Sequence, residues 1–240
     1  MRTILITGGA GGLGAALARR MNEAGWMVYV LDRDRPPPSS GGCWIPGDVR
    51  SFRANSLQAA NVERLDVLVN CAGVNRAAWL ADLREDAWDE VMNVNAKGIF
   101  LVTQACLPLM RRTGEDGFRT VCNVVSNASH VPMRTSLAYN ASKGAAHIMT
   151  LQLARELSPE FTVFGLSPNK LAGTGMSRSI EAQTMRLRGW TAEQAADYQR
   201  KALLAGEETD PEAVAELLAW LLLEKRRHTY LTGCILPYGA

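Results

Sequence analysis

Short apolar segments alternate with helical periodicity along the whole chain. The apolar segments predict strands buried on both faces, at residues 3–7, 28–32, 43–46, 67–70, 120–126, 161–166 and 234–236. Apolar residues at helical spacing predict helices at residues 14–24, 57–62, 84–110, 138–157 and 211–223. Since fully buried strands need helices above and below them, the pattern predicts a doubly wound α/β fold, with a parallel sheet between two helical layers.

One segment breaks this rhythm. Residues 172–209 precede the final predicted helix and mix Met176 and Trp190 with many polar residues. No repeat or change of composition separates a second domain, so we expect residues 1–240 to form one domain. An insertion at the carboxyl edge of a parallel sheet is positioned to cover a ligand, and we expect Met176 and Trp190 to contact the substrate.

The composition is that of an ordinary globular protein, with 47% hydrophobic and 21% charged residues among 240. The net charge of +2 comes from scattered basic residues, which argues against a nucleic-acid partner. The five cysteines form an odd set without metal-ligand spacing, so we expect neither disulfides nor a metal site, and a cytoplasmic location. No apolar run is long enough to span a bilayer and the first residues do not resemble a signal peptide, so no membrane association is expected.

A glycine-rich turn joins the first predicted strand to the first predicted helix. It reads Thr7-Gly8-Gly9-Ala10-Gly11-Gly12-Leu13-Gly14. Glycines permit a tight turn and bring backbone N–H groups close to a pyrophosphate at the helix N-terminus. A purely structural turn would also use glycines, but the strand before it and the helix after it favour dinucleotide binding.

Asp32 ends the next predicted strand. Its carboxylate can accept hydrogen bonds from both hydroxyls of a ribose and would repel a 2′-phosphate, which favours NAD over NADP. Arg33 and Arg35 lie beside it and weaken that preference. A solvated carboxylate at a strand end is the alternative interpretation.

Tyr139 and Lys143 are four residues apart in a helical pattern, which places both side chains on one face. A phenol is a poor proton donor and acceptor at neutral pH unless a neighbouring cation stabilises its anion. Ser126 ends the preceding strand, where its hydroxyl can bind a substrate oxygen. A surface Tyr/Lys pair and a strand-end serine would be the simpler interpretation if either stood alone.

Together these segments resemble the short-chain dehydrogenase/reductase family over essentially the whole chain. The matching motifs follow the family's order: Thr7-Gly8-xxx-Gly12-x-Gly14, Asp48-Val49, Asn70-Cys71-Ala72-Gly73, Val94-Asn95-Ala96-Lys97-Gly98, Ser126 and Tyr139-xxx-Lys143. The resemblance implies a Rossmann-like fold, an NAD(P)-dependent oxidoreductase, and a homodimer or homotetramer packed through the two long helices and the C-terminal elements.

The resemblance also implies roles for individual residues. Tyr139 would be the general acid/base, Lys143 would lower the pKa of Tyr139 and bind the nicotinamide ribose, and Ser126 would orient the substrate. Asn95 would hold a water that links Lys143 to solvent. The implied cofactor-binding residues are Gly8, Gly12, Leu13, Gly14, Asp32, Asp48, Val49, Asn70, Ala72, Gly73, Tyr139, Lys143, Pro168 and Thr174, with Asn70 also stabilising the sheet.

The chain departs from the family pattern after Pro168, and it has polar residues outside the matching motifs. Pro168 is followed by Asn169 where the family usually has glycine, and Thr174 comes six residues after Pro168 rather than five. His130, four residues after Ser126, is either part of the substrate pocket or an ordinary loop histidine. Glu207 and Glu208, close to Asp210, are expected to form a solvated acidic cluster at the start of the last helix.

The sequence therefore predicts an oxidoreductase that interconverts a secondary alcohol and a ketone as its small-molecule partners, with NAD favoured and NADP less expected. An epimerase, dehydratase or decarboxylating reductase that retains its cofactor uses the same Tyr/Lys chemistry and is one alternative. A non-catalytic protein that senses NAD(H) on the same fold is another.

Overall fold

Seven parallel strands form one sheet in the order β3-β2-β1-β4-β5-β6-β7. The computed structural model describes residues 1–113, 119–224 and 229–239. The strands are β1 (Thr3–Thr7), β2 (Met27–Asp32), β3 (Cys43–Pro46), β4 (Val67–Asn70), β5 (Thr120–Val124), β6 (Thr162–Pro168) and β7 (Ile235–Tyr238). The predicted doubly wound α/β fold is confirmed.

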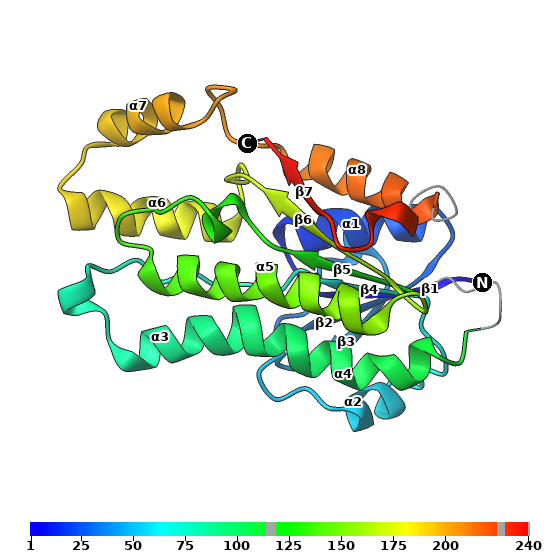
Figure 1. Ribbon diagram of the computed structural model, residues 1–240. Coiled ribbons are helices and arrows are strands. Elements are labelled where there is room, and N and C mark those ends of the chain that lie inside the picture. The colour runs from blue at the N-terminus through cyan, green and yellow to red at the C-terminus, as the bar shows by residue number, and fades with distance from the viewer. Residues whose placement is uncertain (114–118, 225–228, 240) are drawn as a thin grey trace.

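Helices cover both faces of this sheet, as Figure 1 shows. The helices are α1 (Gly12–Glu23), α2 (Ala54–Ala59), α3 (Glu85–Met92), α4 (Gly98–Met110), α5 (Leu137–Leu157), α6 (Gly175–Arg188), α7 (Ala192–Ala202) and α8 (Pro211–Leu223). Helices α1 and α8 lie side by side on one face, where Arg19 and Arg20 pair with Glu212 and Glu216. Helices α4 and α5 lie on the other face (Figure 1).

The sheet separates two apolar cores, and the alternation of side chains along β1 explains why its apolar run is continuous. Ile4 and Ile6 join the core beneath α1 and α8, whereas Leu5 joins the core beneath α4 and α5. All three side chains are fully buried. A strand with helices on both faces must be apolar at every position, which is why the sequence shows an unbroken run.

The helical pattern at residues 84–110 is not one regular helix. The segment begins as α3, continues through a π-helical turn at Asn93–Lys97, and ends as α4. A π-turn inserts one extra residue into the helix and changes the direction in which the following side chains point. Asn95 lies inside this turn and is completely buried.

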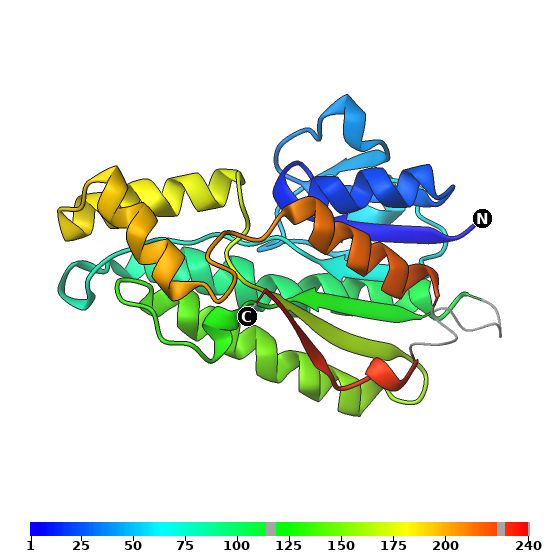
Figure 2. The ribbon, with the colours of Figure 1, turned by 90° about the horizontal axis from the view of Figure 1, so that it is seen from above.

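The carboxyl ends of the strands meet at one edge of the sheet, and helices α6 and α7 extend beyond that edge. Figures 1 and 2 show the two helices projecting to the side, away from the layers of the sheet. Strand β1 lies between β2 and β4. The sheet grows from β1 toward β3 on one side and from β4 toward β7 on the other, so the strand order reverses beside β1. Ligands of doubly wound folds bind at the carboxyl edge beside such a point.

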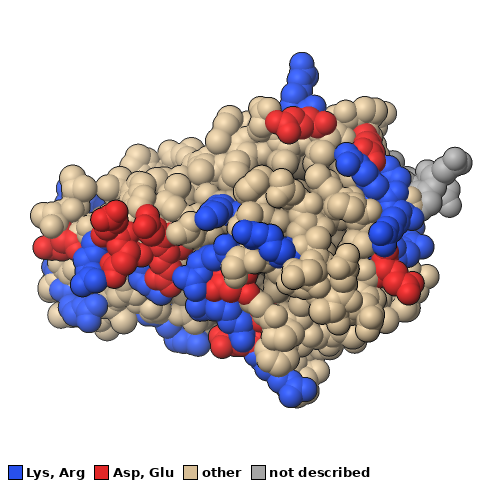
Figure 3. Space-filling model, turned by 90° about the horizontal axis from the view of Figure 1, so that it is seen from below, with Lys and Arg blue, Asp and Glu red and all other residues tan. Residues whose placement is uncertain are grey.

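The outer face of α4 and α5 carries exposed apolar side chains. Phe100 and Ile148 are 49% and 62% exposed. Seen from below, charged side chains extend from the left end into the lower middle of the molecule and along its right edge, with uncharged surface above and between them (Figure 3). Such a surface is suited to contact with another protein, and packing of a second copy through these helices stays a prediction.

Candidate active site

A cavity of about 530 Å³ lies at the carboxyl edge of the sheet. The segments that follow β1, β2, β3, β4, β5 and β6 all contribute to its lining, and α6 and α7 close it on the far side. The volume is within the range of cavities that hold a cofactor or a small substrate. Because so many strand ends converge here, residues far apart in sequence share one site.

The glycine turn forms one wall of the cavity and leaves a helix N-terminus open. Gly8 has a φ of +71°, and a Cβ there would lie 2.7 Å from the backbone of Ala72, so only glycine fits. Helix α1 begins at Gly12, and its N-cap residue Gly11 offers no side-chain hydrogen bond. The first backbone N–H groups of α1 are therefore available to an anion, and the helix dipole favours a negative charge there.

Two carboxylates, those of Asp32 and Asp48, line the cavity. Asp32 Oδ2 accepts a hydrogen bond from the Ala10 N–H at 2.9 Å, and Oδ1 accepts from the Asp34 N–H at 3.1 Å. These bonds hold the carboxylate against the turn while it lines the cavity. The side chain is therefore fixed where a ribose would lie if the helix N-terminus bound a pyrophosphate.

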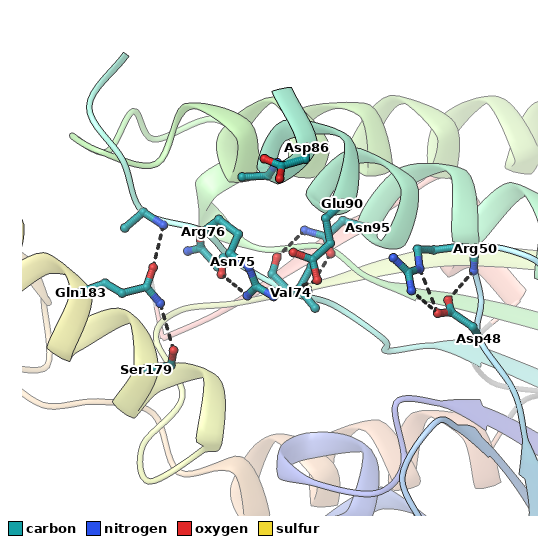
Figure 4. A network of polar contacts seen from close by, with 12 residues as sticks. Asp48, Arg50, Val74, Asn75, Arg76, Asp86, Glu90, Asn95, Ser179 and Gln183 are labelled. Atoms are coloured by element: carbon teal, nitrogen blue, oxygen red, sulfur yellow. Dashed lines mark hydrogen bonds and ion pairs between the residues drawn. The ribbon is translucent and has the colours of Figure 1, made fainter. Parts of the chain in front are cut away.

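Asp48 is held differently. Its Oδ2 accepts from both Nε and Nη2 of Arg50, at 2.8 and 2.6 Å, as Figure 4 shows. The Arg50 guanidinium holds the pKa of the Asp48 carboxyl below its usual range. Asp48 and the neighbouring Val49 both line the cavity. An ionised acceptor beside an apolar side chain suits the amino group and the face of an adenine.

Ser126, Tyr139 and Lys143 come together at the opposite part of the cavity. Tyr139 and Lys143 are one turn apart on α5, and Lys143 Nζ lies 5.8 Å from the centre of the Tyr139 ring. Ser126 follows β5, and its hydroxyl accepts the Ala128 N–H at 3.2 Å. All three residues line the cavity, and the Ser126 side chain acts to lower the pKa of the Tyr139 phenol.

Lys143 is buried and carries a hydrogen bond that fixes its position. The side chain is only 4% exposed, and Nζ donates to the Val124 carbonyl at 2.8 Å. Burial lowers the pKa of this lysine to about 8, because water no longer solvates the ammonium. The group is thus a cation at neutral pH that readily loses its proton.

This burial predicts a pH-dependent stability. The pKa of Lys143 is about 8 in the folded protein against an ordinary value of 10.5. Between these values the unfolded chain holds a proton that the folded protein has lost, so the free energy of unfolding contributed by this group rises with pH. We expect urea denaturation from about pH 7 to about pH 10 to show that the unfolding free energy of the wild type changes more favourably with increasing pH than that of Lys143→Met. Identical pH profiles of the two proteins would contradict this.

The pKa of Tyr139 differs from the expectation. In the protein by itself, burial raises the pKa of the phenol above its ordinary value, and the Ser126 side chain offsets this only in part. Desolvation disfavours the phenolate more than the groups around it stabilise it. The lowered pKa that the family resemblance implies is therefore not a property of these residues alone.

Asn95 lies behind the cavity and does not line it. Its Nδ2 donates to the Val74 carbonyl and to Ser142 Oγ, both at 2.9 Å, and its Oδ1 accepts the Val74 N–H at 2.8 Å. Figure 4 shows this pairing with the backbone of Val74. Both amide hydrogens are thus used inside the protein, and Asn95 positions the segment after β4. The expected water relay stays a prediction.

Two other expected residues lie away from the cavity lining. Asn70 points into the sheet, where its Nδ2 donates to Thr103 Oγ1 at 3.1 Å and to Asn123 Oδ1 at 2.8 Å. It holds β4 to β5 rather than lining the cleft, as Ala72 and Gly73 do. His130 is exposed, and its Nδ1 lies 3.1 Å from Ser129 Oγ. It behaves as the ordinary loop histidine of the alternative interpretation.

The remaining expected residues line the cavity. They are Gly8, Gly12, Leu13, Gly14, Pro168, Thr174, Met176 and Trp190. Thr174 caps α6 by accepting the Ser177 N–H at 3.1 Å, and a Cβ on Gly12 would lie 3.3 Å from its methyl group. The longer path after Pro168 therefore still brings Thr174 against the glycine turn.

Sequence reasoning missed several residues of α6 and α7. Arg188, Tyr198 and Gln199 line the cavity, and Gln183 ties α6 to the segment after β4 by accepting the Ala77 N–H at 3.1 Å (Figure 4). The ion pair between Lys170 and Glu208 joins the segment after β6 to the segment after α7. The apolar pattern of the sequence predicts no helices in residues 172–209, and helical spacing by itself would not indicate which face of α6 or α7 meets the cavity.

Residues 1–113, 119–224 and 229–239 contain no cluster of three or more His, Cys, Asp or Glu side chains able to hold a metal ion. No helix within these ranges has the length and apolar character needed to cross a membrane.

Comparisons with known proteins agree with this fold. The family model described as short chain dehydrogenase matches residues 2–185. A rhamnolipid biosynthesis 3-oxoacyl-[acyl-carrier-protein] reductase from Pseudomonas aeruginosa is 31% identical, over 98% of this chain and 94% of its own length.

Two solved structures are similar over 98% of this chain. A 3-ketoacyl-(acyl-carrier-protein) reductase from Brucella melitensis with NADH has a TM-score of 0.80 and 25% identity, over 96% of its chain. An actinorhodin polyketide ketoreductase variant with NADPH has a TM-score of 0.84 and 27% identity, over 95% of its chain. With the family model covering most of its length, the chain belongs to the short-chain dehydrogenase family.

Proposed function

We propose that this protein is an NAD-dependent oxidoreductase that interconverts a secondary alcohol and a ketone. The observation that carries the proposal is that Ser126, Tyr139 and Lys143 line the same cavity as the glycine turn. A cofactor on that turn and a substrate at Tyr139 would share one enclosed space, as hydride transfer between them requires. The names of the similar proteins, all reductases, support an activity of this class.

The residues present fit a nicotinamide dinucleotide. The open N-terminus of α1 would hold the pyrophosphate, Asp32 the adenosine ribose, and Asp48 with Val49 the adenine. Ala72, Gly73, Pro168 and Thr174 line the cavity between the glycine turn and Tyr139, where the nicotinamide half would lie. When bound, this cofactor supplies or accepts the hydride.

The side chains of this protein would manage the substrate oxygen and its proton. Ser126 donates a hydrogen bond to that oxygen and fixes its direction. In ketone reduction Tyr139 gives its phenolic proton to the same oxygen, and in alcohol oxidation it takes the proton back. The Lys143 ammonium lies 5.8 Å from the Tyr139 ring centre and favours the phenolate electrostatically.

Asp32 supports the choice of NAD. Its carboxylate is held against the glycine turn by the Ala10 N–H and would repel a 2′-phosphate on the ribose. Arg33 also lines the cavity and is the cation that a 2′-phosphate would meet if Asp32 were removed. The preference therefore rests on one carboxylate.

Substitution of this residue tests the preference. Asp32→Ala is expected to lower the ratio of kcat/KM for NADH over NADPH by about tenfold or more, because one charge repulsion and two ribose hydrogen bonds are lost. Asp34→Ala is the matched control, since Asp34 is exposed and does not line the cavity. An unchanged ratio in Asp32→Ala would refute the role of this carboxylate.

A further inference from the structure

An arginine packed against two neighbouring aromatic rings lines the cavity on the α6 and α7 side. The Arg188 guanidinium lies 4.5 Å from the centre of the Trp190 ring and 5.1 Å from that of Tyr198. The two rings are themselves 5.0 Å apart. Stacking of this kind fixes the plane of a guanidinium and leaves its N–H edge directed elsewhere.

That N–H edge lacks strong partners. Nε of Arg188 is shielded from solvent and has no hydrogen-bond partner, and Nη2 makes one weak contact, 3.5 Å from the Arg134 carbonyl. Within residues 1–113, 119–224 and 229–239, no carboxylate forms an ion pair with Arg188. Arg188 lines the cavity and is not neutralised by a carboxylate of the described residues, which favours an anion supplied from outside the chain.

Lys170, a basic residue of the cavity wall beside α6, is already paired. Lys170 lies 2.5 Å from Glu208 and 3.8 Å from Glu181, so these three residues together carry one net negative charge. An anion would be repelled from that cluster and attracted to Arg188. Arg134 also lines the cavity and adds positive charge on the Arg188 side.

The surface between Arg188 and the reacting groups includes apolar side chains. Met133, Met176 and Ile180 line the same cavity. A pocket with a hydrogen-bonding pair at one place, apolar walls, and a single fixed cation at another favours a molecule with matching parts.

We propose that the substrate of this enzyme carries a carboxylate, separated from its ketone or alcohol by an apolar chain, and that Arg188 binds that carboxylate. This inference rests on the proposed oxidoreductase function and adds the class of substrate. A carboxylate has the single charge and planar shape that match one guanidinium, and a phosphate monoester is the competing anion that the test includes.

Paired ketones provide the test. Methyl ketones of increasing chain length that end in a carboxylate are compared with the carboxamides of the same length, with NADH as the reductant. The wild type is expected to favour the best carboxylate over its carboxamide by about 10- to 100-fold in kcat/KM, the effect of one charge-assisted hydrogen-bonded pair. Arg188→Met, which retains a side chain able to pack on the rings, is expected to abolish that preference.

Arg186→Gln is the matched control, because Arg186 is an exposed arginine of the same helix that does not line the cavity. Calorimetric binding of the same compounds to the NAD-loaded protein gives a second readout that needs no turnover. Loss of carboxylate binding in Arg188→Met, but not in Arg186→Gln, supports the inference whether or not any compound is reduced. Failure to reduce any ketone would count against the proposed function only.

Three results would overturn the inference. The first is that the wild type reduces carboxamides as well as carboxylates. The second is that Arg188→Met lowers kcat/KM equally for both kinds of ketone. The third is that a phosphate-terminated analogue is preferred over the carboxylate by more than about tenfold. In each case reduction of any ketone would leave the proposed oxidoreductase function standing.

Discussion

Tyr139→Phe is expected to lower kcat/KM for ketone reduction by roughly 10²- to 10⁴-fold while NADH binding stays within about twofold of the wild type. The substitution removes only the phenolic oxygen, which is the proton donor in the proposed mechanism. The cofactor-binding wall of the cavity, from the glycine turn to Asp48, does not depend on that oxygen. Steady-state kinetics and NADH fluorescence titration measure the two effects separately.

The control for this variant is Tyr230→Phe, since Tyr230 is 91% exposed and lies outside the cavity. Ser126 retains its bond with the Ala128 N–H in the Tyr139 variant, so the local backbone is expected to persist. Activity of Tyr139→Phe close to that of the wild type would remove the phenol from the mechanism.

Lys143→Met is expected to lower kcat/KM by about 10²- to 10³-fold and, unlike Tyr139→Phe, to weaken NADH binding as well. The buried ammonium is the cation nearest the Tyr139 ring, and a Cβ on the cofactor-side residue Gly73 would lie 3.9 Å from Nζ. Its loss therefore affects both the acid/base group and the cofactor wall. The same two measurements detect the joint effect.

Lys201→Met is the comparison, because Lys201 is an exposed lysine of α7 that pairs with Asp197. The unfolding free energy of Lys143→Met must be measured beside the kinetics, since the Val124 carbonyl loses its donor. A stable variant with normal activity and normal NADH binding would contradict the role given to this lysine.

The pKa values explain why two neighbouring groups on one helix were hard to judge from sequence. The Tyr139-xxx-Lys143 spacing predicts that the side chains share a face, and the structure has them 5.8 Å apart, ring centre to Nζ. Spacing carries no information on desolvation, which raises the pKa of Tyr139 and lowers that of Lys143. Positive charge from an oxidised nicotinamide would act in the opposite direction on Tyr139, so the working pKa belongs to the complex.

The architecture could be predicted because its signals are local. Continuous apolar strands require burial on both faces, and a glycine turn between strand and helix has few other uses. The same reasoning located Asp32 at a strand end, where it does line the cavity.

Residues whose position depends on distant partners could not be assigned in this way. Asn70 on β4 donates a hydrogen bond to Asn123 on the neighbouring strand β5. Asn95 lies in a π-turn, and the sequence of that segment has the same apolar spacing as an ordinary helix. Glu208 pairs with Lys170 rather than lying in a solvated cluster, although Asp210 does cap α8 by accepting the Glu212 N–H. Arg188 lines the cavity because α6 and α7, which extend beyond the carboxyl edge of the sheet, form its far wall.

Transfer of label from the cofactor tests the central claim most directly. The protein is incubated with a ketone and NADH that carries deuterium at C4, and the product alcohol is analysed by mass spectrometry. Hydride transfer at the Ser126, Tyr139 and Lys143 site predicts deuterium on the carbinol carbon and loss of one NADH for each alcohol formed. Bound NADH that is never consumed, or product that forms without label and without net NADH loss, would contradict the account in favour of a cofactor-sensing protein or a cofactor-retaining epimerase.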